Sequence, residues 1–150
     1  MTKDQLIAIL KRYGTLYHST ENEELYMLDL EADTNYPETV TVMFIILDQY
    51  FRFMGGSKRY MSTISESAEL LSFINEWNAN RFAITAYLDK NDDSETWSAK
   101  VRSAVLYYNG LEVSGFEHYI NLAIGETWGF FVSLYHGQLK DVEKIFRIIK

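Results

Sequence analysis

The run VTVMFIIL at Val40–Leu47 is apolar on both faces of any strand that it forms. Side chains of a strand alternate between its two faces. One face carries Val42, Phe44 and Ile46, and the other carries Met43, Ile45 and Leu47. A strand of this kind usually lies in the middle of a sheet and needs cover on both sides. The run therefore predicts a central strand with helices on one face and another subunit as a candidate cover for the other.

The spacing of apolar residues predicts the other elements. Helices are expected over about residues 3–13, 65–77 and 116–135 and over Leu139–Ile149, and strands over Leu25–Leu30, Val40–Leu47, Tyr50–Met54, Phe82–Leu88 and Trp97–Val105. The last two strands are expected to pair with each other in antiparallel orientation. The segment from His18 to Glu24 is polar and is predicted to be a connection.

Capping patterns and glycines refine the predicted ends of the elements. Thr2 with Gln5, and Ser114 with Glu117, match the capping box that begins a helix. Gly14 is expected to end the first helix in the left-handed conformation. Gly125 allows a break or kink in the third helix, and the glycines at 55 and 56 are expected to end regular structure.

These elements follow the order α-β-β-β-α-β-β-α-α. A chain of 150 residues with 47% hydrophobic residues has enough apolar material for one core. The sequence therefore predicts a single α+β domain over residues 1–150, with an antiparallel sheet of about five strands and helices packed on one face.

Composition excludes several classes of protein. The 14 basic residues against 21 acidic residues give a net charge of −7, which repels a phosphate backbone, so we expect no nucleic-acid partner. The longest apolar run is far shorter than the roughly 20 residues that cross a bilayer, and the N-terminus lacks the pattern of a signal peptide. Cysteine is absent. We expect a cytoplasmic protein without a membrane partner.

Signatures of catalysis and metal binding are missing from the sequence. His18, His118 and His136 lie far apart and match no metal-ligand spacing. No GxSxG elbow is present, and without cysteine there is no thiol nucleophile. We predict no catalytic residue, no cofactor and no metal site.

Two stretches come near to known ligand motifs and fail. GGSK at Gly55–Lys58 has neither the glycine spacing nor the residue order of a phosphate-binding loop. Asp89, Asn91 and Asp93 match the first spacings of a calcium-binding loop, but Ser94 and Lys100 stand where that loop needs glycine and glutamate. Both stretches are predicted to be ordinary connections.

The segment LLSFINEWNANRFAITAYLD at Leu70–Asp89 resembles the characteristic segment of the YbjN family, which is described as a family of bacterial sensory transduction regulators. The resemblance rests on the Asn-rich helix end Asn75–Asn78 and on the strand end Tyr87–Asp89. It implies a fold similar to that of type III secretion chaperones, in which helices pack on a curved antiparallel sheet and which commonly dimerise. It implies a protein that holds other polypeptides or has a regulatory role.

The absence of site signatures and the two-faced strand favour a non-enzymatic, chaperone-like or regulatory interaction protein that forms a homodimer. Met43, Ile45, Leu47 and Tyr50 are the predicted contact residues. Two alternatives stay open. One is a small-molecule sensor with an aromatic-lined pocket between sheet and helices, and the other is an acidic immunity or antitoxin protein that blocks its partner electrostatically.

Overall fold

The computed structural model describes residues 1–60, 67–81, 83–92, 95–103, 106–107 and 110–140. Its helices are α1 (Lys3–Leu10), α2 (Ser67–Ala79) and α3 (Val113–His136), with a short 3-10 turn at Lys58–Tyr60. Its strands are β1 (Thr15–His18), β2 (Leu25–Leu30), β3 (Val40–Ile46), β4 (Tyr50–Ser57), β5 (Thr85–Lys90), β6 (Trp97–Arg102) and β7 (Leu106–Tyr107). The predicted α+β class is confirmed.

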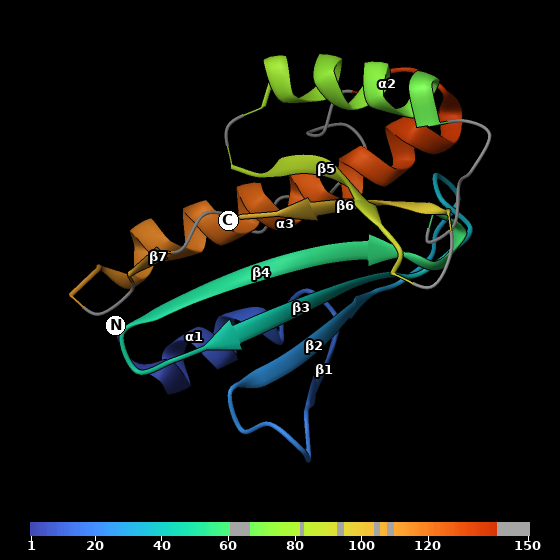
Figure 1. The fold of residues 1–150 in the computed structure, drawn as a ribbon. Helices are drawn as coiled ribbons and strands as arrows, with labels where there is room; N and C mark the ends of the chain where they lie inside the picture. Colours follow the sequence, from blue (N-terminus) through green and yellow to red (C-terminus); the bar gives the residue numbers. More distant parts are fainter. Residues whose placement is uncertain (61–66, 82, 93–94, 104–105, 108–109, 141–150) are drawn as a thin grey trace.

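The strands form one antiparallel sheet with the order β1-β2-β3-β4-β6-β5, and the two-residue β7 pairs with the start of β4 (Figure 1). β3 lies between β2 and β4, so the predicted central position of Val40–Leu47 is confirmed. The predicted antiparallel pair of late strands is also confirmed, because Thr85 of β5 stands opposite Arg102 of β6.

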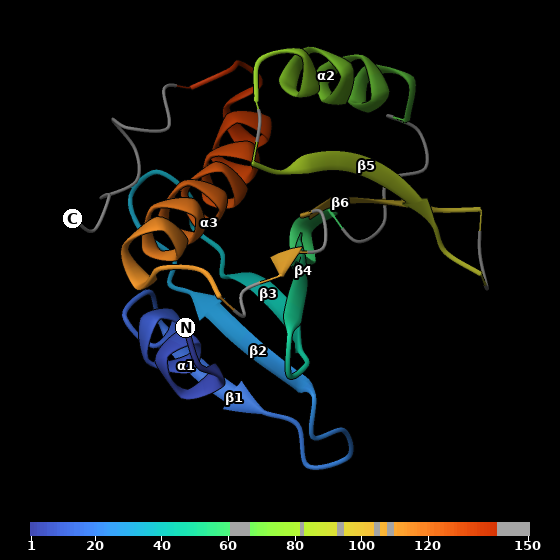
Figure 2. The same cartoon turned by 90° about the vertical axis from the view of Figure 1, so that its left-hand side faces the viewer.

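α1 and α3 lie together on one side of the sheet, while the β5–β6 hairpin extends away from the two helices (Figure 2). Burial alternates along β3, where Val40, Val42, Phe44 and Ile46 are buried. These side chains face the helices, and the ring of Phe51 on β4 packs at 5.1 Å from that of Phe116 on α3. Apolar burial between this face and the two helices supplies the core.

α2 runs along the edge strand β5 above the end of α3 (Figure 1). Trp77 of α2 is fully buried, and its ring lies 5.4 Å from the ring of Phe130 on α3. Leu70 and Ile74 are buried on the same helix. α2 therefore belongs to the same core as the other two helices.

The third helix differs from its prediction at two points. It is continuous from Val113 to His136, and no break occurs at Gly125, which is itself buried. Burial on both sides of this glycine stabilises the helix and outweighs the roughly 1 kcal/mol helix penalty of glycine. The predicted capping box at Ser114 is wrong, because the helix begins after Glu112 and no side chain caps it.

The first helix has the predicted capping box of Thr2 and Gln5, but it ends at Leu10. Gly14 does not have a positive φ, so its predicted role as a left-handed helix end is wrong. A Cβ at Gly14 would lie 2.1 Å from the backbone oxygen of Asp29. Glycine is needed there because the chain enters β1 in close contact with β2.

β1 has no counterpart in the prediction. Its residues Thr15–His18 are mostly exposed and show no apolar alternation, yet they pair with β2 from Thr15 opposite Asp29 to His18 opposite Tyr26. Backbone hydrogen bonds to β2 define this edge strand. The predicted helix at Leu139–Ile149 lies, from residue 141 onward, outside the described residues.

The glycines at 55 and 56 do not end regular structure, because β4 continues to Ser57. Gly55 faces α3, where an added Cβ would lie 2.8 Å from Thr127 Cγ2 and 2.8 Å from Val101 Cγ2. Gly56 faces the other way, and an added Cβ would meet nothing within 4 Å. The pair therefore lets a helix approach one face and leaves a hollow on the other.

Gly55→Ala is expected to lower the free energy of unfolding by about 1–3 kcal/mol, because the methyl group overpacks the contact between β4 and α3. Gly56→Ala is the matched control and should be neutral or slightly stabilising. Urea unfolding followed by circular dichroism measures both. Equal effects of the two substitutions would contradict the assignment of the two faces.

Candidate functional site

The sheet face opposite α3, here called the outer face, consists of the strand residues that alternate with the buried ones. β3 contributes Thr41, Met43 and Ile45, β4 contributes Tyr50, Arg52, Met54 and Gly56, β2 contributes Leu25, Met27 and Asp29, and the β5–β6 hairpin contributes Thr85, Tyr87, Asp89, Lys100, Arg102 and Ser98, which is itself buried. No described helix covers this face (Figure 2). It is the accessible side of the central strand.

Three methionines form a row across the outer face. Met27 stands opposite Met43, and Met43 stands opposite Met54. Tyr17 and Arg102 extend this methionine row at its two ends. Met43 is 38% exposed and Met54 is 36% exposed. Directly opposed side chains on neighbouring strands lie about 5 Å apart, so the row is a continuous apolar strip.

A groove of about 860 Å³ crosses the outer face beside this row. Its floor is β4 at Met54 and Gly56, where the missing side chain leaves space. One side is β3 at Thr41 and Met43, and the other is β6 from Ser98 to Lys100. Besides Met43 and Met54, the groove is lined mostly by polar and charged residues, among them Asp29, Glu38, Lys58 and Lys100, and none of its described lining residues is aromatic.

Polar contacts hold the side chains that border the groove. Thr41 donates a hydrogen bond of 2.8 Å to Asp29 Oδ1, and Lys100 Nζ lies 2.5 Å from Asp89 Oδ2. The Tyr87 hydroxyl donates to the sulfur of Met54 at 3.1 Å. Burial raises the pKa of Tyr87, so its hydroxyl stays protonated and remains a donor. These contacts fix the side chains of Thr41, Lys100 and Met54 at the border of the groove.

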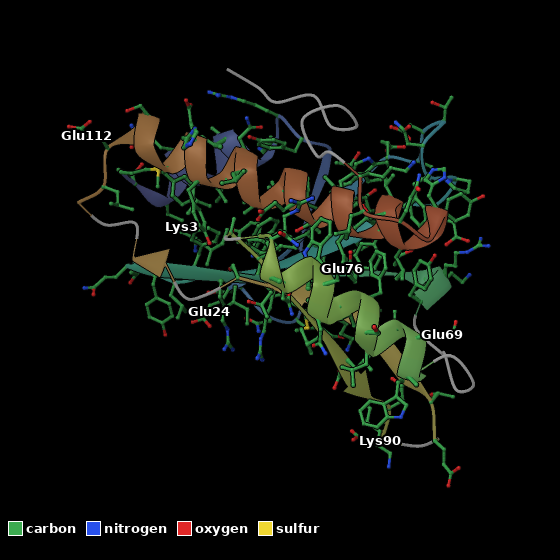
Figure 3. All side chains as sticks on the ribbon, turned by 90° about the horizontal axis from the view of Figure 1, so that it is seen from above. Lys3, Glu24, Glu69, Glu76, Lys90 and Glu112 are labelled. Carbon is green, nitrogen blue, oxygen red and sulfur yellow. The ribbon has the colours of Figure 1, made fainter. Side chains whose placement is uncertain are left out.

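The four predicted contact residues fall into two groups. Met43 and Ile45 lie on the outer face, where Met43 is exposed and Ile45 is half-buried. Leu47 and Tyr50 lie at the β3–β4 turn, where the Leu47 amide donates a hydrogen bond of 2.9 Å to the Tyr50 carbonyl. Both line a separate hollow together with Lys3 and Glu24, two residues whose side chains are labelled in Figure 3. Tyr50 alternates with the buried Phe51 and so belongs to the outer face at the start of β4, whereas Leu47 lies in the turn after the end of β3.

Sequence reasoning missed most of the groove. Met54, Gly56 and Lys100 come from two strands that are distant in sequence and meet only through the β4–β6 pairing. Met27 was visible as the residue that alternates with the buried Tyr26 and Leu28. Its alignment with Met43 was not visible, because alternation alone does not specify which residues of two strands stand opposite each other.

The helix end in the segment that resembles the YbjN family binds the edge strand β5. Asn78 lies within the last turn of α2, and its side-chain amide exchanges two hydrogen bonds of 2.9 Å with the backbone of Ala86 on β5. An edge strand exposes backbone groups that otherwise pair with another chain. Asn78 therefore closes part of the β5 edge from α2, whose charged residues Glu69 and Glu76 are labelled in Figure 3.

A buried carboxylate fixes the segment that leads into β5. Glu126 of α3 is 3% exposed, and its Oε2 accepts hydrogen bonds from the amides of Ala83 at 2.9 Å and Ile84 at 3.1 Å. A carboxylate that accepts backbone amides makes a charge-assisted hydrogen bond. α3 thus holds the segment between α2 and β5 in place.

Within the described residues, no group of three histidine or carboxylate side chains lies close enough to hold a metal ion. None of the helices that the structure describes is both long enough and apolar enough to pass through a bilayer.

Burial raises the pKa of Tyr13 and of Tyr36 to about 12, so both hydroxyls remain protonated.

The model of the YbjN family, described as "Putative bacterial sensory transduction regulator", matches residues 2–134. The chain belongs to the YbjN family. The family is described as a regulator and not as an enzyme. The match includes Asn78, Trp77 and Glu126, so the contacts that close the β5 edge and anchor its start lie inside the YbjN region.

A solved structure has the same fold. The crystal structure of YbjN from E. coli, a protein described as "a putative transcription regulator", aligns with a TM-score of 0.62 and 15% sequence identity. The alignment covers 92% of this chain and 95% of that chain. No curated protein matches the sequence. At this identity the likeness to the E. coli protein shows the YbjN fold alone.

Proposed function

We propose that this YbjN-family protein is a non-enzymatic regulatory domain that binds another polypeptide through its outer face. The observation that carries the proposal is the exposed methionine row beside an open groove. Large apolar side chains grouped on a surface are typical of interaction sites. Met27, Met43 and Met54 form such a group on one side of the sheet.

The description of the family as a regulator supports this proposal, and so does the description of the E. coli protein as a transcription regulator. Regulation by holding a partner needs a surface and no reacting groups. The outer face provides apolar contact area with a polar border at Asp29 and Lys100. This combination is typical of protein interfaces, in which a polar rim surrounds an apolar centre.

A chaperone-like role, a homodimer and a cytoplasmic location belong to the same proposal. The alternatives of an acidic inhibitor and of an aromatic-lined ligand pocket stay predictions. The ligand pocket is predicted between the sheet and the helices, whereas the groove lies on the opposite side of the sheet. Between sheet and helices, aromatic rings such as Phe51 and Phe116 pack directly on one another.

The proposal predicts that Met43→Gln with Met54→Gln weakens partner binding without unfolding the protein. Two polar replacements in an apolar contact are expected to cost about 2 kcal/mol of binding, roughly a thirtyfold rise in Kd. A tagged protein captures its partner from the native host, the partner is identified by mass spectrometry, and calorimetry then measures Kd with purified components.

Leu122→Gln is the matched control, because Leu122 is 37% exposed on α3 and lies away from the outer face. Light scattering of the same variants measures any homodimer. Partner binding that survives the double substitution, or that is lost equally in the Leu122 variant, would remove the outer face from the proposal.

A further inference from the structure

β5 is the last strand of the sheet, so one of its two edges faces away from β6. The side-chain amide of Asn78 bonds to both the N–H and the carbonyl of Ala86 at 2.9 Å, so these two backbone groups point away from β6. In an antiparallel ladder, successive residues bond alternately to the neighbouring strand and to the other side. The backbone groups of Leu88 and Lys90 therefore point to the same side as those of Ala86.

The hydrogen bond at the end of the hairpin agrees with this alternation. The Asn91 amide donates to the Thr96 carbonyl at 2.9 Å, so Asn91 faces β6 and Lys90 does not. No hydrogen bond joins the outward groups of Leu88 and Lys90 to a described residue. These two amides and two carbonyls, here called the free edge, are therefore available to another extended chain.

A cleft of about 510 Å³ lies between α2 and the β5–β6 hairpin, beside the free edge (Figure 1). Its lining includes Ala68, Leu71 and Asn75 of α2 and Leu88 and Trp97 of the hairpin. Leu71 is 47% exposed, and none of the described lining residues is charged. Because Leu88 belongs both to the cleft and to the free edge, a chain that pairs with this edge reaches the cleft.

We infer that the free edge binds an extended segment of another protein, which adds a strand to the sheet beside α2. This inference does not depend on the proposed function, because the free edge lies apart from the methionine row of the outer face. An added strand gains affinity from main-chain hydrogen bonds and specificity from alternate side chains that enter pockets. The free edge supplies the hydrogen-bonding groups, and the cleft supplies the pocket.

Antiparallel pairing specifies the side chains of this segment. The residue that exchanges hydrogen bonds with Leu88 places its side chain on the same side of the sheet as Leu88, where the cleft lies, so an apolar residue fits. The next residue points to the outer face beside Asp89, whose side chain pairs with Lys100 and is still 45% exposed. A basic residue fits there, because opposite charges on neighbouring strands attract. The segment therefore alternates apolar and basic residues.

The charges near the free edge also favour a basic partner. The exposed Glu69 follows Ala68 at the start of α2, and the exposed Asp92 lies two residues after Lys90. Figure 3 labels Glu69 and Lys90 at the same end of α2 and the hairpin. The net charge of −7 attracts a basic segment over a longer range and opposes a second copy of the chain at this edge.

The test uses the whole chain and fluorescein-labelled peptides of about seven residues, a length that suits one strand, in which valine alternates with lysine. The first peptide is unmodified. The second carries N-methyl groups on its valine amides, which face β5 in the inferred pairing, and the third carries them on its lysine amides, which face away. Fluorescence anisotropy is expected to give a Kd at least about tenfold higher for the second peptide than for the other two.

A fourth peptide has glutamate in place of lysine and should bind at least about tenfold more weakly than the first at low salt. Leu71→Gln is expected to raise the Kd of the first peptide about fivefold, because the cleft loses apolar surface. Leu122→Gln is the matched control on α3 and should leave this Kd unchanged. Met43→Gln with Met54→Gln should also leave it unchanged, because the methionine row lies outside the cleft.

Hydrogen exchange followed by NMR locates the bound peptide. In the free protein, the amides of Leu88 and Lys90 should exchange quickly, whereas the amide of Asp89 is protected by its bond to β6. The first peptide is expected to slow exchange at Leu88 and Lys90 by at least about tenfold.

Equal binding of the two methylated peptides, equal binding of the glutamate peptide, or an unprotected Leu88 amide would overturn the inference. It is also overturned if light scattering shows a dimer in which the Leu88 amide is already protected, because a second copy then occupies the edge. Loss of the peptide in the Met43 and Met54 variant would place it on the outer face instead. If all peptides fail while that variant loses a purified native partner, the inference fails and the proposed function stands.

Discussion

Trp77→Ala is expected to lower the free energy of unfolding by about 3–5 kcal/mol. The Trp77 side chain is fully buried between α2 and α3, with its ring 5.4 Å from Phe130 and under the guanidinium of Arg81 at 4.5 Å. Truncation to alanine removes these contacts and leaves a cavity at the junction of the two helices. Urea unfolding followed by fluorescence and circular dichroism measures the loss.

Two control variants separate packing from other causes. The indole nitrogen of Trp77 is buried and has no hydrogen-bond partner among the described residues. Trp77→Phe should therefore keep most of the stability, because it retains an aromatic ring and loses no hydrogen bond. Leu71→Ala removes an exposed side chain from the same helix and should change stability by less than about 1 kcal/mol. If Trp77→Ala also changed the free energy of unfolding by less than about 1 kcal/mol, packing of Trp77 would not hold α2 on α3.

Glu126→Leu is expected to lower the free energy of unfolding by about 2–4 kcal/mol. The substitution removes the acceptor for the amides of Ala83 and Ile84, and it leaves a partly buried donor at Ala83 and a buried donor at Ile84 without this partner. Part of this cost is offset because a buried carboxylate no longer has to be desolvated. Equilibrium unfolding in urea measures the total, and hydrogen exchange at the start of β5 locates it.

Glu126→Gln keeps a side-chain oxygen that accepts hydrogen bonds, so its cost should be smaller than that of the leucine variant. Glu117→Leu is the control on the same helix. Glu117 forms a surface ion pair with Arg12 at 2.9 Å, and exposed pairs of this kind contribute about 0–1 kcal/mol. If the leucine variants at 117 and 126 lose equal stability, Glu126 does not anchor β5.

The segment that resembles the YbjN family stabilises the fold. This role rests on the contacts of Trp77 and Asn78 within it and on Glu126, which binds it from α3. Asn78 holds the edge of β5, Glu126 holds its start, and Trp77 fixes α2 on α3. The surface proposed for partner binding lies elsewhere, on the outer face at Met43 and Met54. Substitutions at Trp77, Asn78 and Glu126 should therefore lower the free energy of unfolding. Substitutions at Met43 and Met54 should instead weaken partner binding.

The sequence by itself determined the elements whose side chains alternate strongly. β2 and β3 are found at or within one residue of their predicted ends, because each places apolar residues on the helix-facing side at every second position. The α+β class and the placement of Met43 on the exposed side of β3 follow from the same periodicity. A local pattern is sufficient to predict an element when its buried residues recur at regular intervals along the chain.

Tertiary structure alone decided the features that depend on two distant segments. β1 exists because its polar backbone pairs with β2, and α3 passes through Gly125 because both sides of that glycine are buried. The methionine row depends on the register of three strands, and the anchor at Glu126 joins α3 to residues 83 and 84. No local pattern specifies such pairings, since register and burial are set by contacts between segments.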